Sequence, residues 1–449
     1  MKSSNCLSLV LMLFVSSIEA QRPVPPVRPN DLNFTEAQAE EHNCGPLCQQ
    51  NLQRYEELDR EVFGNVPYDY EFYETAANFF ESRPGDLLKL QQQNASAYDI
   101  PPGTSLWYMQ YTSVGVGGSK VPATAFIALP YAKVPGQKTR LVAYAHGTIG
   151  VVPACAASSS YNGFDYHSWQ LLTGPGYAVV ATDYAGLGNY YTSHKYGNPV
   201  LNSEDVYFSV VAARKAFPGV FTDGWAAVGH SQGAGAVWGL SENPRVATTE
   251  SGNYLGSVAI APSSRLNDLL TAVPLNVSWG FATLIVNIFQ ALMFPIQPII
   301  LTPEATARYP LIYELQLCDT AQAELNGDLP DHGVVDLTPA ITQHNHEAFI
   351  AFQNEYGAAT GRKGYKELLV IQSIDDEVVN VTATKEAYEY ACKVGNTIHL
   401  SLYSGLDHDD SVAASAPEWL EWLDNKFMGV PYSHKCVMET RSILLDAVK

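Results

Sequence analysis

The clearest chemical feature of the chain is its single G-x-S-x-G sequence, Gly229-His230-Ser231-Gln232-Gly233. A short apolar run, 225–228, precedes this sequence, and small residues follow it at 234–236. That context predicts a tight turn from a strand to a helix, which holds the serine in strained backbone geometry. The N-terminus of the following helix offers positive potential and free N–H groups. Ser231 is therefore the predicted nucleophile, and the backbone N–H of Gln232 is the first predicted oxyanion donor.

A serine hydroxyl is a poor nucleophile near neutral pH and needs a general base. Two apolar runs late in the chain, 367–372 and 397–403, lead to Asp375-Asp376 and to His408 respectively. A serine on a strand-to-helix turn is followed along the chain by its acid and then by its histidine, which is the order found here. We therefore predict His408 as the base. Neighbouring residues on one strand end point in different directions, so only one of the two aspartates is expected to orient His408.

An earlier apolar run ends at Tyr144-Ala145-His146-Gly147-Thr148, where the second oxyanion donor is expected. We predict the N–H of Thr148 for this role, with Gly147 as the alternative. His146 is interpreted as a structural, hydrogen-bonding residue. Asp183 follows another strand and is a rival acid, but it precedes the nucleophile, so we also expect a structural role for it.

The remaining histidines are weaker candidates for chemistry. His399 lies inside a strand pattern, and His434 lies near the end of the chain beside Cys436, so each is expected to be structural. His344 and His346 would need further ligands to hold a metal, and the sequence offers none in a recognisable pattern. No metal or other cofactor is predicted.

Short β-rich runs alternate with helical segments beyond residue 100. Several of the runs are continuously apolar, as at 178–181 and 368–371, which is typical of strands buried on both faces of a parallel sheet. The pattern predicts an α/β fold with a mostly parallel eight-stranded sheet. The eight predicted strands cover 105–112, 121–129, 140–145, 177–182, 225–229, 256–261, 367–372 and 397–403.

Two helices are predicted with particular detail. One covers 46–63, with Leu47, Leu52, Leu58 and Val62 as its apolar positions. The other begins at Asn202 as the N-cap and carries an apolar stripe as far as Phe217.

The interval 265–366 breaks the alternation, because about a hundred residues separate the sixth predicted strand from the seventh. We interpret this interval as an inserted helical cap. Its centre, 281–300, is strongly apolar, and such a surface must face the core, an acyl chain or an interface.

The N-terminus has the features of an exported protein. Lys2 precedes an apolar run that ends in small residues, which predicts a signal peptide at 1–20. Residues 21–31 hold four prolines and are expected to be extended. Six cysteines remain after cleavage, and an even number in an exported chain indicates disulfides. Sequons for N-glycosylation occur at Asn33, Asn94, Asn276 and Asn380.

The formal net charge of −20 argues against nucleic acids and anionic membranes as partners. We expect a secreted, extracellular monomer that binds a lipid or another acyl ester, with transient contact between its cap and a lipid interface.

These motifs together resemble the fungal secretory lipases of the Candida antarctica lipase A type, within the α/β-hydrolase superfamily. The resemblance covers about residues 68–427. It rests on the following segments: 71–73, 84–88, 146–148, 155–158, 182–188, 229–233, 376–379 and His408. Ser373 and Asn380 depart from the family pattern, which has glycine and proline at these positions.

The resemblance implies a helical lid over an acyl tunnel and Asp376 as the triad acid. It also implies the disulfides Cys155–Cys318 and Cys392–Cys436. Cys44 and Cys48 lie outside the resemblance and would then pair with each other.

The predicted domains are the signal peptide at 1–20, an N-terminal extension at 21–67, a core at 68–264 and 367–449, and the cap at 265–366. The predicted function is that of a serine carboxylic ester hydrolase, either a triacylglycerol lipase or a broad acyl esterase, acting through Ser231, Asp376 and His408. Two alternatives stay open: a secreted serine peptidase of the same fold, and a non-catalytic binding protein built on it.

Overall fold

The computed structural model describes residues 34–63, 66–132, 136–272, 283–284, 286–288, 301–330, 333–335, 339–431 and 435–441. The predicted signal peptide and proline-rich segment lie outside these residues, as do Asn33, Asn276, His434 and most of 281–300.

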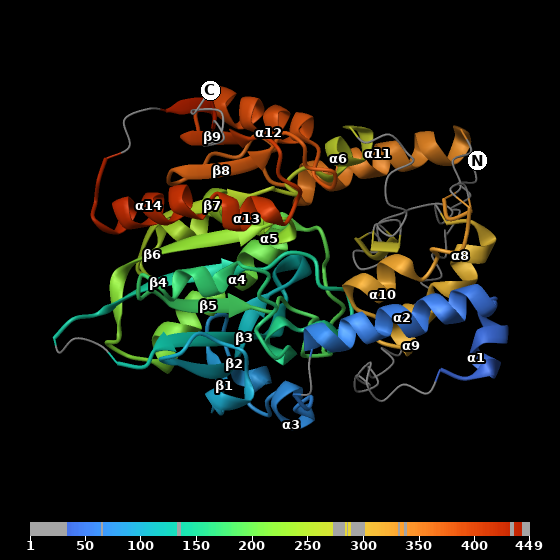
Figure 1. The fold of residues 1–449 in the computed structure, drawn as a ribbon. Coiled ribbons are helices and arrows are strands. Elements are labelled where there is room, and N and C mark those ends of the chain that lie inside the picture. Colours follow the sequence, from blue (N-terminus) through green and yellow to red (C-terminus); the bar gives the residue numbers. More distant parts are fainter. Residues whose placement is uncertain are drawn as a thin grey trace, which may run out of the picture.

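Ten strands of the described part of the chain form one twisted sheet at the centre of the fold (Figure 1). The strands lie in the order β1-β2-β3-β5-β4-β6-β7-β8-β9-β10. β1, β2, β3 and β5 pair antiparallel in turn, and every pair from β5 to β10 is parallel. The strands are β1 (Leu87–Gln92), β2 (Thr104–Val114), β3 (Lys120–Pro130), β4 (Thr139–Ala145), β5 (Ala178–Thr182), β6 (Phe221–His230), β7 (Asn253–Ile260), β8 (Leu368–Ser373), β9 (Ile398–Tyr403) and β10 (Cys436–Thr440).

The predicted α/β fold with a mostly parallel sheet is confirmed, but the predicted number of eight strands is wrong. The eight predicted strands correspond to β2–β9, and the two that were missed are the edge strands β1 and β10. No residue of β1 or β10 is fully buried, whereas every residue of β5 and β8 is buried. An edge strand covered on one side lacks the continuous apolar run that identifies a central parallel strand.

Helices cover the sheet, which explains the complete burial of its central strands. α4 and α5 pack against each other, α4 contacts β2 and β5, and α5 contacts β6 and β7. α14 also contacts β6 and β7. The helices of this part of the chain are α3 (Tyr70–Tyr73), α4 (Pro199–Ala216), α5 (Gln232–Glu242), α12 (Val381–Lys393), α13 (Asp410–Ala414) and α14 (Ala416–Phe427).

The start of α4 corrects the prediction of Asn202 as its N-cap. The cap is Asn198, whose side chain accepts a hydrogen bond from the N–H of Leu201, and Pro199 occupies the first helical position. Proline fits that position because it needs no hydrogen bond from its nitrogen and its φ is already helical. Asn202 lies one turn further on, buried inside the helix.

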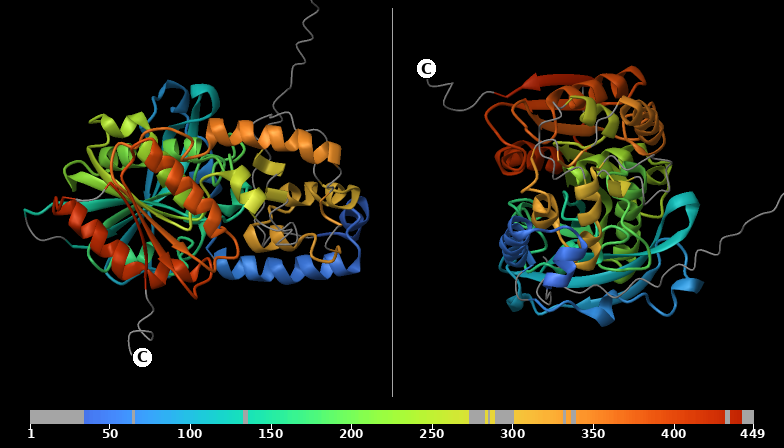
Figure 2. Two further views of the ribbon diagram at one scale, coloured as in Figure 1. Left: turned by 90° about the horizontal axis from the view of Figure 1, so that it is seen from above. Right: turned by 90° about the vertical axis from the view of Figure 1, so that its right-hand side faces the viewer.

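A second group of helices lies beside the carboxyl end of β7, from which the predicted cap leaves the sheet (Figures 1 and 2). We call this group the helical lobe. α2 and α11 lie on opposite sides of the lobe, with its shorter helices between them (Figure 2). The lobe consists of α1 (Glu36–Glu41), α2 (Pro46–Phe63), α6 (Leu266–Ala272), α8 (Pro303–Arg308), α9 (Pro310–Glu314), α10 (Asp319–Glu324) and α11 (Pro339–Tyr356).

The N-terminal extension is an integral part of this lobe, which the sequence did not indicate. α2 has the predicted bounds and packs against α10. Its buried face differs from the predicted one, because Leu47 is 63% exposed and Leu58 is 37% exposed. The buried positions are instead Cys48, Leu52, Glu56, Asp59 and Phe63. Helical spacing places these five on one face, and two of them are acidic, so a search for apolar residues alone misses the stripe.

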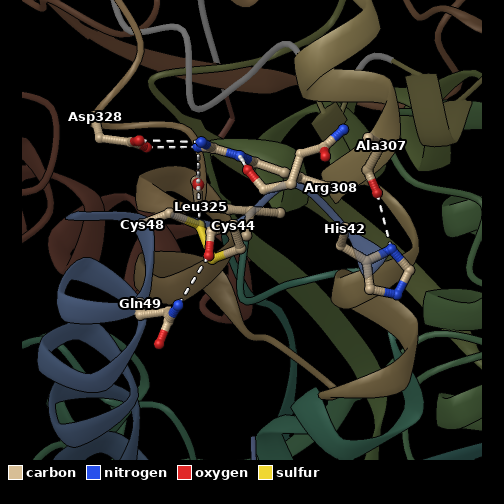
Figure 3. Close-up of a disulfide and its surroundings, with 9 residues drawn as sticks. His42, Cys44, Cys48, Gln49, Ala307, Arg308, Leu325 and Asp328 are labelled. Carbon is tan, nitrogen blue, oxygen red and sulfur yellow. Dashed lines mark hydrogen bonds and ion pairs between the residues drawn. A yellow bond between two sulfur atoms is a disulfide. The ribbon is translucent and has the colours of Figure 1, made fainter. Parts of the chain in front are cut away.

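The disulfide Cys44–Cys48 joins the first turn of α2 to the residues just before it, and Arg308 of α8 lies nearby (Figure 3). Beside it, Nδ1 of His42 lies 2.9 Å from the carbonyl oxygen of Ala307. The buried Arg308 donates to the carboxylate of Asp328 at 3.0 Å and to the carbonyl of Leu325 at 3.2 Å. The contact between His42 and Ala307 ties the segment before α2 to a residue 265 positions later in the chain.

No helix among the described residues is both long enough and apolar enough to cross a bilayer.

Candidate active site

Ser231 occupies the turn between β6 and α5 with φ +54° and ψ −115°. A non-glycine residue with positive φ is uncommon, and such strain persists only where the surroundings impose it. Here the N–H of Ser231 donates to the carbonyl of Ile260 in β7 at 2.9 Å. Its carbonyl accepts from Ser263 and Gly235, each at 3.1 Å. The turn is therefore held from both sides, as the predicted strand–serine–helix geometry requires.

The two glycines of the motif allow the strand and the helix to approach closely. A Cβ atom on Gly229 would lie 2.2 Å from the carbonyl oxygen of Gly233. A Cβ atom on Gly233 would lie 1.9 Å from the carbonyl oxygen of Ala145 at the end of β4. Neither position accepts a side chain without a backbone shift, so the glycines set the position of Ser231 against the neighbouring strand.

Asp376 and His408 form a buried pair at the ends of β8 and β9. Nδ1 of His408 lies 2.9 and 3.0 Å from the two carboxylate oxygens of Asp376. The carboxylate also accepts from the N–H groups of Val378 and Val379 and from Nε2 of Gln372. An ionised carboxylate only accepts hydrogen bonds, so Nδ1 carries the ring proton and Nε2 keeps its lone pair.

The neighbouring Asp375 points elsewhere. It is exposed, and its carboxylate accepts a 2.6 Å hydrogen bond from the N–H of Gly405. Of the two aspartates left open by the sequence, the structure joins only Asp376 to His408. Asp375 instead supports the loop that carries the histidine.

That loop must reach back across the sheet. β6 and β9 are three strand spacings apart, which is roughly 14 Å at about 4.8 Å per spacing. Ser373 donates to the carbonyl of Leu406 at 2.6 Å, which holds the loop over the end of β8. The rings of His408 and His230, the residue before Ser231, have centroids 4.6 Å apart.

Nε2 of His408 is buried and has no hydrogen-bond partner among the described residues. Ser231 and His408 are 8% and 7% exposed, so both lie just below the surface of the described structure. The hydroxyl of Ser231 therefore makes no hydrogen bond to Nε2 of His408 here. Such contacts are often long without substrate and tighten when it binds.

The backbone around Ser231 offers donors for a developing oxyanion. Gln232 is the first residue of α5, so its N–H has no acceptor within the helix. The side-chain Nε2 of Gln232 contacts Nε2 of His194 at 2.9 Å. The N–H of Gly147, the alternative second donor, already points to the hydroxyl of Tyr166 at 3.2 Å. The side-chain hydroxyl of Thr148 is 2.8 Å from the hydroxyl of Tyr196, and its N–H makes no hydrogen bond to any residue that the structure describes.

Tyr166 and His230 link the two sides of the site, and sequence analysis gave neither a role. Nε2 of His230 faces the carbonyl oxygen of His408 at 3.2 Å, so Nε2 carries the proton. Its Nδ1 then accepts from the Tyr166 hydroxyl at 2.9 Å. Burial lowers the pKa of His230 well below its usual value, in keeping with a neutral ring. The resulting chain runs from Gly147 through Tyr166 and His230 to the backbone of His408.

Two further carboxylates approach His408. Burial raises the pKa of Asp319, at the start of α10, to about 7, with a further contribution from Asp409. Oδ1 of Asp409 lies 3.9 Å from Nε2 of His230. Among the described residues, His230, His408 and Asp409 are the one trio of ligand-type side chains close enough to meet at a metal ion. However, the Nε2 proton of His230 points to a carbonyl, so this ring is not available as a ligand in its present tautomer.

The residues expected to be structural lie apart from this chemistry. His146 is buried, with Nδ1 2.7 Å from the carbonyl of Gly147, and burial lowers its pKa to about 4. Asp183 accepts from Ser158 and Thr124, and burial raises its pKa to about 6. His399 lies within β9, and the side chain of His346 is exposed.

The described residues contain three disulfides: Cys44–Cys48, Cys155–Cys318 and Cys392–Cys436. The second joins the loop after β4, which carries Thr148, to the start of α10. The N–H of Asp319 donates to the carbonyl of Ile149 beside it. The helical lobe is therefore covalently attached next to the predicted oxyanion loop. Of the described sequons, Asn94 is exposed and Asn380 is the N-cap of α12.

The sheet order, the strained serine between β6 and α5, and the acid–histidine pair after β8 and β9 define an α/β-hydrolase fold. The structure resembles that of Candida antarctica lipase A, with a TM-score of 0.64 and 15% sequence identity over 85% of this chain and 91% of the lipase. The closed state of that lipase gives a TM-score of 0.63 at 16% identity, covering 84% and 89%. The predicted resemblance is thus confirmed at the level of the fold.

Two bacterial structures are also similar. The rice cell wall degrading esterase LipA of Xanthomonas oryzae has a TM-score of 0.57 and 14% identity, over 76% of this chain and 97% of the esterase. A putative hydrolase of Legionella pneumophila has a TM-score of 0.60 and 16% identity, over 77% and 100%. No protein-family model matches the sequence, and no curated protein matches it.

Proposed function

We propose that the protein is a serine carboxylic ester hydrolase whose catalytic triad is Ser231, His408 and Asp376. The observation that carries the proposal is the buried Asp376–His408 pair, whose free Nε2 lies beside the turn of the strained Ser231. A structural ion pair has no need of an unpaired nitrogen, because a buried ring nitrogen without a partner costs free energy.

In this mechanism the Ser231 oxygen attacks the ester carbonyl carbon while Nε2 of His408 takes its proton. The N–H groups of Gln232 and Thr148 donate to the resulting oxyanion. The bond to the alcohol then breaks, and His408 returns the proton to the leaving oxygen. Water repeats these steps on the acyl-enzyme, with His408 as base, and releases the acid and Ser231.

Esterase activity, the hydrolysis of carboxylic esters in general, is the broader form of this proposal. Lipase activity, the hydrolysis of long-chain acyl esters, is the narrower form. The two named neighbours with printed activities are a lipase and a cell wall degrading esterase, which supports ester rather than peptide hydrolysis. The apolar segment 281–300, which favours long acyl chains, lies largely outside the described residues. Three disulfides support secretion, because such bonds persist in oxidising compartments.

The direct test is a panel of p-nitrophenyl esters of increasing acyl length, run beside a triglyceride emulsion and an aminoacyl anilide. We expect hydrolysis of the esters and none of the anilide. Each methylene bound in an acyl tunnel contributes about 0.8 kcal/mol, so a lipase should show kcat/KM rising with chain length. Hydrolysis of the anilide alone would establish the peptidase alternative, and no turnover of any substrate would favour a non-catalytic protein.

A further inference from the structure

Two carboxylates lie beside the proposed general base in addition to Asp376, and the proposed mechanism assigns them no role. One belongs to Asp409, which directly follows His408 in the chain and has a side chain that is 73% exposed. This carboxylate lies within 4.8 Å of a ring nitrogen of His408, and its Oδ1 is 3.9 Å from Nε2 of His230. It accepts no hydrogen bond from any residue that the structure describes.

The other carboxylate belongs to Asp319 and reaches the site from the helical lobe. Asp319 is the first residue of α10, and its N–H donates to the carbonyl of Ile149 at 3.0 Å. Ile149 directly follows Thr148, the predicted second oxyanion donor. The disulfide Cys155–Cys318 reinforces the same junction. The backbone of Asp319 is therefore fixed beside the loop that carries Thr148.

The electrostatic neighbours of Asp319 show where its carboxyl group lies. Burial and the neighbouring Asp409 raise the pKa of Asp319 to about 7, whereas His408 acts in the opposite direction. Burial, with a further contribution from Asp319, raises the pKa of Tyr196, whose hydroxyl is 2.8 Å from that of Thr148. The half-buried carboxyl of Asp319 thus lies between the loop of Thr148 and His408.

The main charged neighbours of these two carboxylates are themselves acidic, apart from His408. Burial raises the pKa of Asp409, His408 lowers it, and Asp407, Glu377 and Asp376 raise it further. No described lysine or arginine is among the main groups that act on Asp319 or Asp409. The ring of His408, which is 7% exposed and whose Nε2 has no described partner, therefore lies in a negative electrostatic field.

The mechanism places the alcohol part of the ester in this field. His408 must return its proton to the leaving oxygen, so that oxygen lies against Nε2 in the reaction. A positive charge two or three bonds beyond the leaving oxygen would then lie within roughly 8 Å of the carboxylates. In a medium between protein and water, each such attraction favours the cation by roughly two- to sixfold.

We propose that Asp409 and Asp319 are specificity-determining residues that favour esters whose alcohol part carries a positive charge. This inference rests on the proposed esterase function and names the class of alcohol, an ammonium alcohol, that the same active site prefers. A neutral alcohol of equal shape gains nothing from the two carboxylates. The formal net charge of −20 is the rival explanation of any such preference, because it attracts cations to the whole surface.

The experiment compares acetylcholine with 3,3-dimethylbutyl acetate, which has the same shape but a carbon atom in place of the charged nitrogen. Values of kcat/KM are measured by acid release at about pH 8.5, above the pKa of Asp319, in low salt and in about 1 M NaCl. The variants are Asp409→Asn and Asp319→Asn. The matched control is Asp223→Asn, an exposed aspartate near the start of β6, roughly 20 Å from the end that carries Ser231.

We expect the wild type to hydrolyse acetylcholine about fivefold or more faster than the neutral ester at low salt. The preference should fall toward one in about 1 M NaCl, where the screening length is only about 3 Å. Asp409→Asn and Asp319→Asn should each lower the ratio roughly two- to sixfold, and Asp223→Asn should leave it unchanged. Because Asp409 is exposed, its variant keeps the test valid if Asp319→Asn does not fold.

A wild-type ratio of one or less, or a ratio unchanged in both Asp409→Asn and Asp319→Asn, would overturn the inference. An equal loss in Asp223→Asn would assign the preference to the overall charge and overturn it as well. Hydrolysis of the neutral ester without charge preference refutes this inference and leaves the esterase proposal intact. If neither ester nor p-nitrophenyl acetate is hydrolysed, the esterase proposal fails and the inference fails with it.

Discussion

The substitution Asp376→Asn tests the acid–histidine pair most closely, because every neighbour of this carboxylate is a donor. One oxygen accepts from the N–H groups of Val378 and Val379, and the other accepts from Nε2 of Gln372. The side-chain amide of Gln372 cannot flip to present its oxygen to residue 376, because its Nε2 also donates hydrogen bonds to two backbone carbonyls and a flip would break them. The new amide group of asparagine must therefore point toward His408.

An NH₂ group facing Nδ1 of His408 turns that nitrogen into an acceptor and moves the ring proton to Nε2. The proposed base then has no lone pair for the Ser231 proton. A wrong tautomer of this kind lowers kcat by roughly ten-thousandfold, which corresponds to about 5 kcal/mol in the barrier. The matched control is Asp375→Asn, which weakens only the 2.6 Å bond to Gly405 and should cost less than about tenfold.

Both variants should be assayed for kcat on p-nitrophenyl acetate and for thermal unfolding. The expected result is a large loss of kcat in Asp376→Asn with cooperative unfolding retained. If Asp376→Asn keeps a tenth of the wild-type kcat, or if Asp375→Asn is the more damaging change, the tautomer argument is wrong.

Three further outcomes follow from the described contacts. Tyr166→Phe removes the hydroxyl that joins Gly147 to His230, and kcat should fall roughly tenfold with little change in KM; an unchanged kcat would show that this chain is not needed. Replacing Cys155 and Cys318 together by serine opens a loop of 163 residues, which in the chain-entropy model lowers the free energy of unfolding by up to about 5 kcal/mol, measurable by urea denaturation. Burial raises the pKa of Asp59 to about 8 and that of Asp205 to about 7. The folded state therefore binds more protons than the unfolded state up to about pH 8, so the Tm should fall between pH 6.5 and pH 8; a Tm that rises over this window would contradict the burial of these carboxyls.

The sequence predicts the central part of the fold well, because strands such as β5 and β8 are buried on both faces and read as continuous apolar runs. It predicts Ser231 and His408 through chain order and the turn motif. The position of the two aspartates after a strand does not decide between Asp375 and Asp376, because neighbouring side chains differ in direction. The choice came from the family resemblance and from the structure, in which only Asp376 contacts His408.

Other parts of the site leave little trace in the sequence. Tyr166 lies 64 residues from His230, belongs to no motif, and meets it only in the folded chain. The role of α2 was missed because two of its five buried positions are acidic, and Asp59 is used there to accept from the N–H of Cys318. Contacts of this kind depend on tertiary packing, which local periodicity does not encode.

The most direct test of the central claim is covalent labelling with a fluorophosphonate, followed by mass spectrometry of the digested protein. We expect one adduct, on the peptide that contains Ser231, formed at the rate at which esterase activity is lost. Ser231→Ala should remain folded, take no label, and lose a factor on the order of a million in turnover. An adduct on a different serine, or esterase activity that survives in Ser231→Ala, would show that Ser231 is not the nucleophile.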